Sequence, residues 1–558
     1  MQERMKVSEW LASEIKQSDI THVFFVEAIL RNTLLALVRQ GVKPILAHSE
    51  AAAAYMADGY SRIARKPGIC MSQSVGAANL AAGLQDAWLG KGQVLAITGR
   101  KPQAHQFRNA YQEIDHRKAF SATAKISLHA ESPEMVPRVL AQAWRALHDG
   151  KMQPVHIDVE GLMGEHVENG EVEPVQSPLL AQIRFEVQRP SDERARECAE
   201  RVLAARKVVI VAGYEAAYCR VGTLVLELAR ALQAPVATTV GAKALIPTDD
   251  PLNIGTVGSY GMAVTNEVVH EADVVIAIGC QLSDQNTHGW RVIRPGQTVV
   301  QLDRCLDDIG KSYLKTVALV GDLRSSITAL GKAVAAHGAE RDAAFAHEAA
   351  NRMQAWRHTA RELTESNSHP IRVERIIHEI CRALPEDGIL VADTGYSAIW
   401  SSVYAGLNGT RQEYLRAAGS LGWAFPAALG AKCAAGGRKV VCFAGDGGFY
   451  YHVAEIETAL RNDIPLVVVV NNNSGFGQDS VNMYAKGMSR EDVHLLAGFD
   501  PVSVAAVAKG FGANGMRVTR PEDLRPAIEA ALQSNTLTIV EVTTPIDMAA
   551  PEAWAPPG

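Results

Sequence analysis

The chain has 558 residues, of which 47% are hydrophobic and 21% are charged, and its formal net charge is −6. This composition is typical of a globular protein with several domains. The absence of long runs of like charge argues against nucleic acid or a membrane surface as the main partner, and no apolar run approaches the roughly 20 residues that span a bilayer. The eight cysteines form no Cys-x-x-Cys pair, which disfavours a metal cluster or a disulfide framework. Together with the polar start of the chain, this makes the cytoplasm the expected compartment.

Short apolar runs alternate with helical patterns in three successive stretches. The first contains "HVFFV" and "GICMSQS", the second "KVVIVAG" and "DVVIAIG", and the third "GILVADTG" and "PLVVVVNNN". Such alternation predicts an α/β protein with three doubly wound parallel-sheet domains. We expect domains over residues 1–170, 185–335 and 365–558, with "GEHVENGEVEPVQSP" as a linker after the first. Parallel sheets bind ligands at the carboxyl ends of their strands, so functional residues should directly follow the apolar runs.

A glycine-rich turn follows one apolar run of the third stretch. Asp446 lies there between Gly445 and the pair Gly447 and Gly448, and Asn473 ends the next apolar run 27 positions later. Glycines let a backbone approach phosphate oxygens closely. An Asp carboxylate and an Asn carbonyl oxygen at adjacent strand ends are hard ligands that suit Mg²⁺ bridging a diphosphate. Gly-Asp-Gly alone is more often a turn and an Asn run more often a loop, but their combination indicates a metal–diphosphate site.

This segment, from Phe443 to Gly477, resembles the cofactor motif of thiamine diphosphate-dependent enzymes, and the resemblance extends over nearly the whole chain. "HSEAAAAYMADGYSRIARKPGIC", "VADTGYSAIW" and "GSLGWAFPAALGAK" are similar to further signatures of the family. The acetolactate synthase-like and pyruvate decarboxylase-like group is the most similar. The resemblance implies a pyrimidine-binding N-terminal domain, a central domain and a diphosphate-binding C-terminal domain.

The resemblance also implies which residues hold the cofactor and its metal. Asp446, Asn473 and the main-chain carbonyl of Gly475 would bind Mg²⁺. Leu421 would lie beneath the bent cofactor and press its two rings together, although the same residue could be an ordinary core leucine. The residues expected to contact thiamine diphosphate are Asn79, Thr394, Gly395, Tyr396, Ser397, Gly419, Leu421, Gly445, Asp446, Gly447, Gly448, Asn473, Gly475 and Phe476.

Glu50 is a lone acid between the apolar run "PILA" and four alanines. Glutamate is seldom placed in such surroundings. In the family, the glutamate at this position contacts N1′ of the aminopyrimidine and favours the imino tautomer that takes the proton from thiazolium C2. An apolar setting would strengthen that hydrogen bond. The alternative is that Ser49 or Glu50 merely begins a helix, and both interpretations can hold together.

Two departures from the family pattern bear on the substrate. Glu27 lies where the family places a proline or a substrate-facing histidine, so it is either an acid or base near C2 or a solvent-facing residue at a strand end. The usual turn before Asn79 is one residue shorter, and Gln73 precedes it. Both departures disfavour acetolactate synthesis from two pyruvates. Gln112 matches a residue that lies near C2, and the expected catalytic and substrate-contacting residues are Glu27, Glu50, Gln73, Gln112 and Gln478.

The leading hypothesis is an enzyme that uses thiamine diphosphate and Mg²⁺ to make or cleave a C–C bond next to the carbonyl of a small molecule, as a 2-keto acid or acyloin carboligase, lyase or decarboxylase. Alternatives are acetolactate synthase proper, a 2-hydroxyacyl-CoA lyase, a cyclic 1,2-dione hydrolase, or a non-catalytic regulator that retains the fold. Gln281 replaces an arginine that often touches FAD in the family, so FAD is not expected. The resemblance implies a homodimer or homotetramer, because the family builds its site from two subunits.

Overall fold

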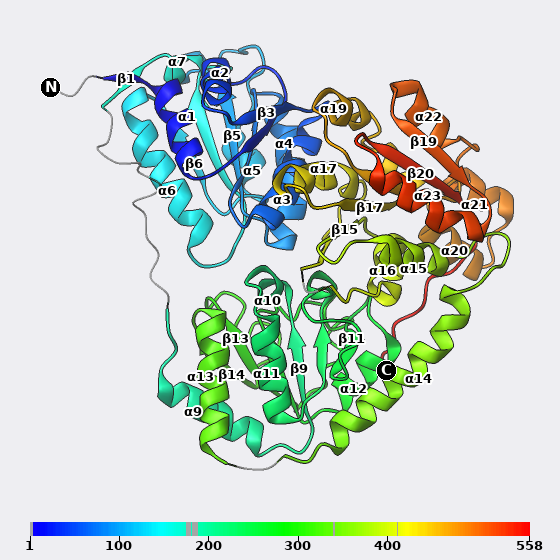
Figure 1. Cartoon of the computed structure of the whole chain (residues 1–558). Helices are drawn as coiled ribbons and strands as arrows, with labels where there is room; N and C mark the ends of the chain where they lie inside the picture. The colour runs from blue at the N-terminus through cyan, green and yellow to red at the C-terminus, as the bar shows by residue number, and fades with distance from the viewer. Residues whose placement is uncertain (1–3, 174–179, 181–187, 339–340, 410, 558) are drawn as a thin grey trace.

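A computed structural model describes residues 4–173, 180, 188–338, 341–409 and 411–557. It contains three six-stranded sheets, each entirely parallel and covered by helices, and one two-stranded sheet (Figure 1). This confirms the predicted fold class. No helix among the described residues is long and apolar enough to cross a membrane.

The N-terminal sheet has the strand order β3-β2-β4-β5-β7-β6. Its strands are β2 (His22–Phe25), β3 (Lys43–Leu46), β4 (Gly68–Ser72), β5 (Val94–Arg100), β6 (Ser127–Ala130) and β7 (Val155–Glu160). Its helices are α1 (Val7–Gln17), α2 (Arg31–Arg39), α3 (Glu50–Ala64), α4 (Gly76–Gly90), α5 (His116–Phe120), α6 (Val136–His148) and α7 (Glu165–Glu168).

The segment expected to be a linker is not wholly irregular. Its first part contains α7 and β8 (Glu171–Val172), and β8 pairs antiparallel with β1 (Met5–Lys6) near the start of the chain. This part therefore packs as the closing edge of the N-terminal domain, because its backbone finds hydrogen-bonding partners there. Residues 174–178 of the segment lie outside the described residues.

The central sheet has the order β11-β10-β9-β12-β13-β14. Its strands are β9 (Val208–Ala212), β10 (Val236–Thr238), β11 (Asn253–Thr256), β12 (Val274–Ile278), β13 (Thr298–Asp303) and β14 (Thr316–Val320). Its helices are α9 (Asp192–Leu203), α10 (Tyr214–Tyr218), α11 (Gly222–Leu232), α12 (Ala263–Glu271) and α13 (Leu323–Ala336). The long helix α14 (Ala344–Thr364) then leads to the C-terminal domain (Figure 1).

The C-terminal sheet has the order β16-β15-β17-β18-β20-β19. Its strands are β15 (Ile389–Ala392), β16 (Glu413–Arg416), β17 (Val440–Gly445), β18 (Val467–Asn472), β19 (Asn514–Val518) and β20 (Thr538–Thr543). Its helices are α15 (Val373–Ala383), α16 (Tyr396–Tyr404), α17 (Ala424–Ala434), α18 (Asp446–Tyr450), α19 (Glu455–Arg461), α20 (Gly477–Ala485), α21 (Arg490–Ala497), α22 (Val504–Phe511) and α23 (Pro521–Gln533).

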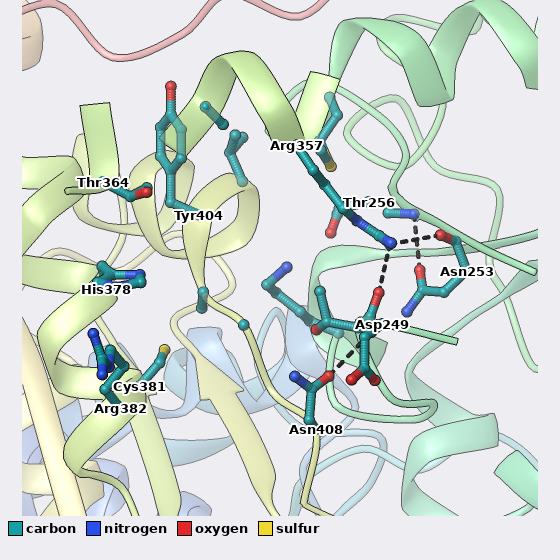
Figure 2. A pocket seen from close by; sticks show the side chains of 18 of the residues that line it. Asp249, Asn253, Thr256, Arg357, Thr364, His378, Cys381, Arg382, Tyr404 and Asn408 are labelled. Carbon is teal, nitrogen blue, oxygen red and sulfur yellow. Dashed lines mark hydrogen bonds between the residues drawn. The ribbon is translucent and has the colours of Figure 1, made fainter. Parts of the chain in front are cut away.

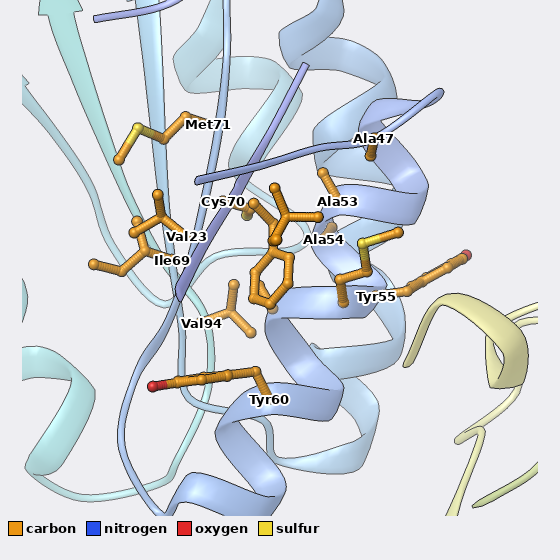
Figure 3. Packing of buried hydrophobic residues seen from close by; sticks show 14 of the residues in the cluster. Val23, Ala47, Ala53, Ala54, Tyr55, Tyr60, Ile69, Cys70, Met71 and Val94 are labelled. Carbon is orange, nitrogen blue, oxygen red and sulfur yellow. The ribbon is translucent and has the colours of Figure 1, made fainter. Parts of the chain in front are cut away.

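Strands buried on both faces explain the continuous apolar runs in the sequence. In the N-terminal domain, residues of β2, β4 and β5 pack against α3, and Phe24 meets the ring of Tyr60 edge-on at 5.9 Å between centroids (Figure 3). Of the four alanines after Glu50 on the same helix, Ala51 is partly buried, and Ala52, Ala53 and Ala54 are fully buried. Their small side chains allow α3 to lie close to its neighbours.

Helix α3 also joins the N-terminal domain to the C-terminal domain by packing against α17 (Figure 1). The two helices approach each other at glycines. A Cβ atom added at Gly59 would lie 2.0 Å from the carbonyl oxygen of Ala427, and one at Gly430 would lie 1.8 Å from that of Met56. Glycine is therefore required at both positions, and α3 is held firmly between two domains.

Candidate active site

Asp446 and Asn473 lie at the ends of neighbouring strands, as predicted. Strands β17 and β18 pair in parallel, with Gly445 opposite Asn471. Asp446 follows β17 directly and Asn473 follows β18. Among the described residues, the Oδ1 atoms of Asp446 and Asn473 are both buried without a hydrogen-bonding partner. Two orphaned oxygens of this kind need a bound ligand, and they suit a hard cation such as Mg²⁺.

The structure distinguishes Asn473 from the two asparagines before it. The side-chain oxygen of Asn471 accepts a hydrogen bond of 2.6 Å from the Thr544 hydroxyl. The side chain of Asn472 donates to the main-chain oxygen of Val502 at 2.9 Å and to Glu541 at 3.0 Å. The side-chain oxygen of Asn472 accepts a hydrogen bond of 3.3 Å from the Ser474 N–H. Of the three asparagines, Asn473 is thus the one whose side-chain oxygen is buried without a partner, which supports the choice made from the motif spacing.

The surroundings of Asp446 prepare its carboxylate for a cation. Its side chain is 1% exposed, and burial raises the pKa to about 6, opposed by hydrogen bonds from main-chain N–H groups, including that of Asn473. The N–H of Gly475 donates to its Oδ2 at 3.1 Å. Among the described residues, no hydrogen bond uses the Gly475 carbonyl, so this expected third metal ligand also has room for a cation. Mg²⁺ would compensate the buried charge.

A cavity of about 260 Å³ lies over these strand ends. The predicted diphosphate loop, residues 394–397, follows β15 and lines this cavity. Leu421 and Tyr260 also line it. Leu421 is only partly buried, so it faces the cavity instead of the core. The predicted cofactor-contacting and substrate-contacting residues that line this cavity are Thr394, Gly395, Tyr396, Ser397, Leu421, Gly445, Gly447, Gly448, Asn473, Gly475, Phe476 and Gln478.

Sequence reasoning missed Asp393, the acid directly before the diphosphate loop. It is 1% exposed and accepts hydrogen bonds from the N–H groups of Thr394 at 2.8 Å and Gly422 at 3.0 Å. Burial raises its pKa to about 7. A Cβ atom at Gly448 would lie 2.4 Å from its Oδ2. Asp393 thus fixes two loops of the cavity together, and its place between an apolar run and Thr-Gly was the available signal.

Gly419 lies beside this cavity without lining it. Its N–H donates to Oδ1 of Asp86 at 3.0 Å, and the N–H of Ser420 donates to the same oxygen at 2.9 Å. Asp86 belongs to α4, so an acid of the N-terminal domain fixes the loop of the C-terminal domain that precedes Leu421. Among the described residues, the Gly419 carbonyl and the Leu421 N–H take part in no hydrogen bond. The Gly419 carbonyl can therefore accept a hydrogen bond from a ligand ring, and the Leu421 N–H can donate one to it.

Glu50 begins α3, and the Ser49 hydroxyl caps that helix by accepting a hydrogen bond of 3.1 Å from the Ala52 N–H. The prediction that this region starts a helix is therefore confirmed. The expected apolar burial of the Glu50 carboxylate is wrong for the single chain. The carboxylate is only half-buried. The alanines that follow it pack into the core and do not cover it. Asn79 donates a hydrogen bond of 3.3 Å to Glu50 Oε2.

The turn before Asn79 lies directly against Glu50. A Cβ atom at Gly76 would lie 2.4 Å from Glu50 Oε1. Asn79 itself lies in the first turn of α4, which begins at Gly76. Gln73 precedes this helix and is partly buried. Glu50 and the N-terminus of α4 thus form one exposed polar surface of the N-terminal domain.

Ser74 connects this surface to Gln112. The Ser74 hydroxyl donates to the main-chain oxygen of Gln112 and lies 3.3 Å from Nε2 of His116. Nδ1 of His116 is in turn 2.8 Å from Oδ1 of Asp158, and all three residues, Ser74, His116 and Asp158, are buried. Sequence reasoning missed this chain of contacts, because Ser74, His116 and Asp158 are distant in the sequence.

The same cluster contains His156, and its three ionisable side chains could be mistaken for a metal site. The Thr98 hydroxyl lies among them, 3.2 Å from His116 Nδ1, 2.7 Å from His156 Nε2 and 2.9 Å from Asp158 Oδ1. It occupies the position that a cation would need. Burial lowers the pKa of His156 to about 3, so its imidazole is neutral. Because the Thr98 hydroxyl contacts all three side chains, the cluster forms a hydrogen-bond network.

Glu27 lies apart from the cofactor cavity. Its side chain is 54% exposed and pairs with Arg31 on α2 at 2.5 Å. None of Glu27, Glu50, Gln73 and Gln112 lines the cavity at the ends of β15, β17 and β18. Within the described part of one chain, the predicted site is thus divided into a diphosphate half on the C-terminal domain and a polar half on the N-terminal domain.

An acidic cluster lies at the strand ends of the central sheet. Strand ends of parallel sheets are the usual nucleotide site, but here Lys91 contacts Glu215 after β9 and Asp308 after β13, the latter at 3.0 Å. Asp303 ends β13, and burial together with Glu215 raises its pKa to about 7. Gln281 lines an adjacent cavity of about 330 Å³. The charged residues that line that cavity are Arg62, Lys91, Asp284 and Arg416.

Comparison with known proteins agrees with this geometry. Residues 5–119 match the family described as "Thiamine pyrophosphate enzyme, N-terminal TPP binding domain". Residues 195–330 match the central domain of the same enzymes, and residues 393–542 match their C-terminal TPP binding domain. The chain is therefore an enzyme that uses thiamine diphosphate and a divalent metal, typically Mg²⁺.

Individual relatives identify the group within these enzymes. The acetolactate synthase large subunit of Parasynechococcus marenigrum (strain WH8102) is 30% identical over 512 residues, covering 90% of this chain and 80% of that protein. The probable acetolactate synthase large subunit of Methanocaldococcus jannaschii is 28% identical, covering 94% of this chain and 88% of that protein. The probable 2-ketoarginine decarboxylase AruI of Pseudomonas aeruginosa is 29% identical, covering 90% and 87%. The chain belongs to the acetolactate synthase-like and pyruvate decarboxylase-like family, whose members form or cleave C–C bonds.

Proposed function

We propose that this enzyme makes or cleaves a C–C bond next to the carbonyl of a small acyloin, dione, acyl-CoA or 2-keto acid, at a site completed by two copies of the chain. The single observation that carries the proposal is the pair of buried, unpartnered oxygens on Asp446 and Asn473. When bound, thiamine diphosphate supplies the carbon that adds to the carbonyl and stabilises the negative charge of the bond-breaking step.

Each group of residues has a distinct role in this proposal. Asp446, Asn473 and the Gly475 carbonyl hold the metal, and the glycine amides around Gly447 bind diphosphate oxygens. Leu421 supports the rings from below. Glu50 would hold the proton at N1′ of the aminopyrimidine, where a half-buried carboxylate becomes fully enclosed once a second chain covers it.

The proposed substrate class rests on Glu27. An ionised carboxylate at this end of β2 repels a substrate carboxylate. Its partner in the single chain is Arg31, at 2.5 Å, and both side chains are more than half exposed, so this surface pair offsets little of the repulsion. This arrangement favours an acyloin, a dione or an acyl-CoA over two pyruvates. Simple decarboxylation of a 2-keto acid, the activity named for the Pseudomonas relative, is the second candidate. Product analysis with a panel of these four classes separates them.

A homodimer or homotetramer follows from the divided site. The N-terminal polar half and the C-terminal diphosphate half do not line one cavity within the described chain, so a partner chain must bring the two halves together. Analytical ultracentrifugation of the cofactor-loaded enzyme should show at least a dimer. A fully active monomer would contradict the proposal. We further propose that no flavin binds, and the purified protein should show no flavin absorbance.

The experiment that tests the proposed function is the substitution Asp446→Ala. Removing this ligand should abolish Mg²⁺-dependent binding of thiamine diphosphate, measured by quenching of tryptophan fluorescence, and activity with it. Asp500→Ala is the matched control, because Asp500 is exposed and outside the cavity. Normal cofactor affinity in Asp446→Ala would refute the assignment.

A further inference from the structure

A second large cavity lies apart from the cofactor site. It has a volume of about 700 Å³ and lies between the central domain and helices α14, α15 and α16. Figure 2 shows Arg357 and Asn253 on one side of it and His378 and Cys381 on the other. It shares no lining residue with the cofactor cavity. Its volume is that of a site for a small organic molecule.

Lys243 lines this cavity and carries a charge that the protein does not neutralise. Its side chain belongs to a residue that is only 5% exposed. Among the described residues, no carboxylate lies within ion-pairing distance of its Nζ, and its Nζ forms no hydrogen bond. The ionisable groups that act on it are the Cys381 thiol and the Arg357 guanidinium, and burial lowers the pKa of Lys243 to about 8. A buried ammonium without a partner is rare and unfavourable.

Two other lining side chains, those of Arg357 and His378, also have polar atoms that an anion could contact. Arg357 uses one terminal nitrogen to bind the main-chain oxygens of Thr248 and Asn253, the latter at 3.0 Å, and it forms no ion pair within the described structure. Nε2 of His378 is buried without a hydrogen-bonding partner. The acids of the lining, Asp249, Glu365 and Glu386, form no ion pair with Lys243.

One part of the remaining wall is apolar and aromatic. The rings of Trp356 and Tyr404 stack at 5.9 Å between centroids. Met262, Met353 and Val403 continue this surface. One buried ammonium matches a single negative charge, and the apolar walls match a hydrocarbon or aromatic body. Arg361 and Arg382 also line the cavity, so its positive charge alone does not separate a carboxylate from a phosphate. The apolar walls favour the ligand that has a hydrocarbon body.

We propose that this cavity binds a small organic carboxylate, with its carboxyl group on Lys243 and its apolar body against Trp356, Tyr404 and Met353. The site is separate from the chemistry described above, so the ligand binds in addition to thiamine diphosphate. The pairing removes the uncompensated buried charge, and the same pairing selects a carboxylate over a neutral molecule of equal shape.

The test is isothermal titration calorimetry of the enzyme loaded with thiamine diphosphate and Mg²⁺. The probes are benzoate, hexanoate, benzyl alcohol and inorganic phosphate. We expect benzoate or hexanoate to bind at one site per chain and to change the fluorescence of Trp356, while benzyl alcohol and phosphate bind far more weakly. Lys243→Met should weaken carboxylate binding by at least about tenfold. Lys332→Met is the control, since Lys332 is exposed on α13, and should change nothing.

The proposal fails if neither carboxylate binds, if benzyl alcohol or phosphate binds as tightly, or if Lys243→Met binds normally. It also fails if the carboxylate displaces thiamine diphosphate, because the ligand would then occupy the active site. Lys243→Met should keep its cofactor affinity and melt at a higher temperature without ligand, because a buried unpaired charge is removed. Lys243→Arg, which keeps the charge, should retain measurable carboxylate binding and serves if the Met variant folds poorly.

Discussion

Substitution of Gly430 by alanine tests how tightly α3 and α17 must approach each other. The added Cβ atom would lie 1.8 Å from the carbonyl oxygen of Met56, while ordinary contacts begin at 3.4 Å. The helices must therefore separate by about 1.6 Å along this line. Both clashing partners include helix backbone, so neither side can relax by a change of rotamer.

The net effect follows from two opposing terms. Replacing glycine by alanine inside a helix favours the folded state by about 1 kcal/mol. Overpacking costs about 1–3 kcal/mol and occasionally more, and a clash of backbone with an added Cβ atom lies at the upper end of that range. The clash should win, and the free energy of unfolding should fall by about 2 kcal/mol. Glu50 begins α3, so the displaced helix should also move its carboxylate and lower kcat while leaving Mg²⁺-dependent cofactor binding intact.

Urea unfolding followed by circular dichroism measures the first effect, and steady-state kinetics measures the second. Gly331→Ala is the matched control, because Gly331 lies inside α13 with no atom within 4 Å of an added Cβ. That control should be slightly stabilised by the propensity term alone. If Gly430→Ala unfolds at the same urea concentration as Gly331→Ala, the close helix contact does not exist as described.

Four further predictions concern the site. Glu50→Gln should keep the fold but slow proton–deuterium exchange at thiazolium C2 by orders of magnitude, and exchange at the wild-type rate would exclude the assigned role. Glu27→Ala should bind cofactor normally yet lose most turnover, with Glu27→Gln milder if the acid only donates a hydrogen bond; normal turnover in both would make Glu27 a surface residue. His116→Gln should release the Ser74 contact with the Gln112 loop and raise KM more than it lowers kcat, whereas a uniform loss of folded protein would indicate a purely structural role. Burial raises the pKa of Asp393 from 3.8 to about 7. Its contribution to the stability of the cofactor-free protein is therefore present at low pH and is lost as the pH rises through about 7. Asp393→Asn should weaken this pH dependence of the free energy of unfolding in urea titrations, and an unchanged profile would contradict the prediction.

Local sequence patterns determined the parallel sheets and the diphosphate half of the site. An apolar run ends at Asp446 and the next at Asn473, and strands in such a sheet align their carboxyl ends. The residues of this half lie in short segments at a few strand ends, so the spacing of motifs along the chain was enough to predict that they lie together. The start of α3 at Ser49 and Glu50 was equally readable, because a cap is a contact between residues three positions apart.

Only the tertiary structure decided the features that join distant residues. It showed that Glu50 is half-buried beside Asn79 in the single chain, and that Ser74, His116 and Asp158 form one buried network. It also placed Lys243 without a partner in a cavity between two domains. Periodicity tells which face of an element is buried but not which element covers it. Pairings across hundreds of residues depend on how whole domains pack, and a local pattern contains no information on that packing.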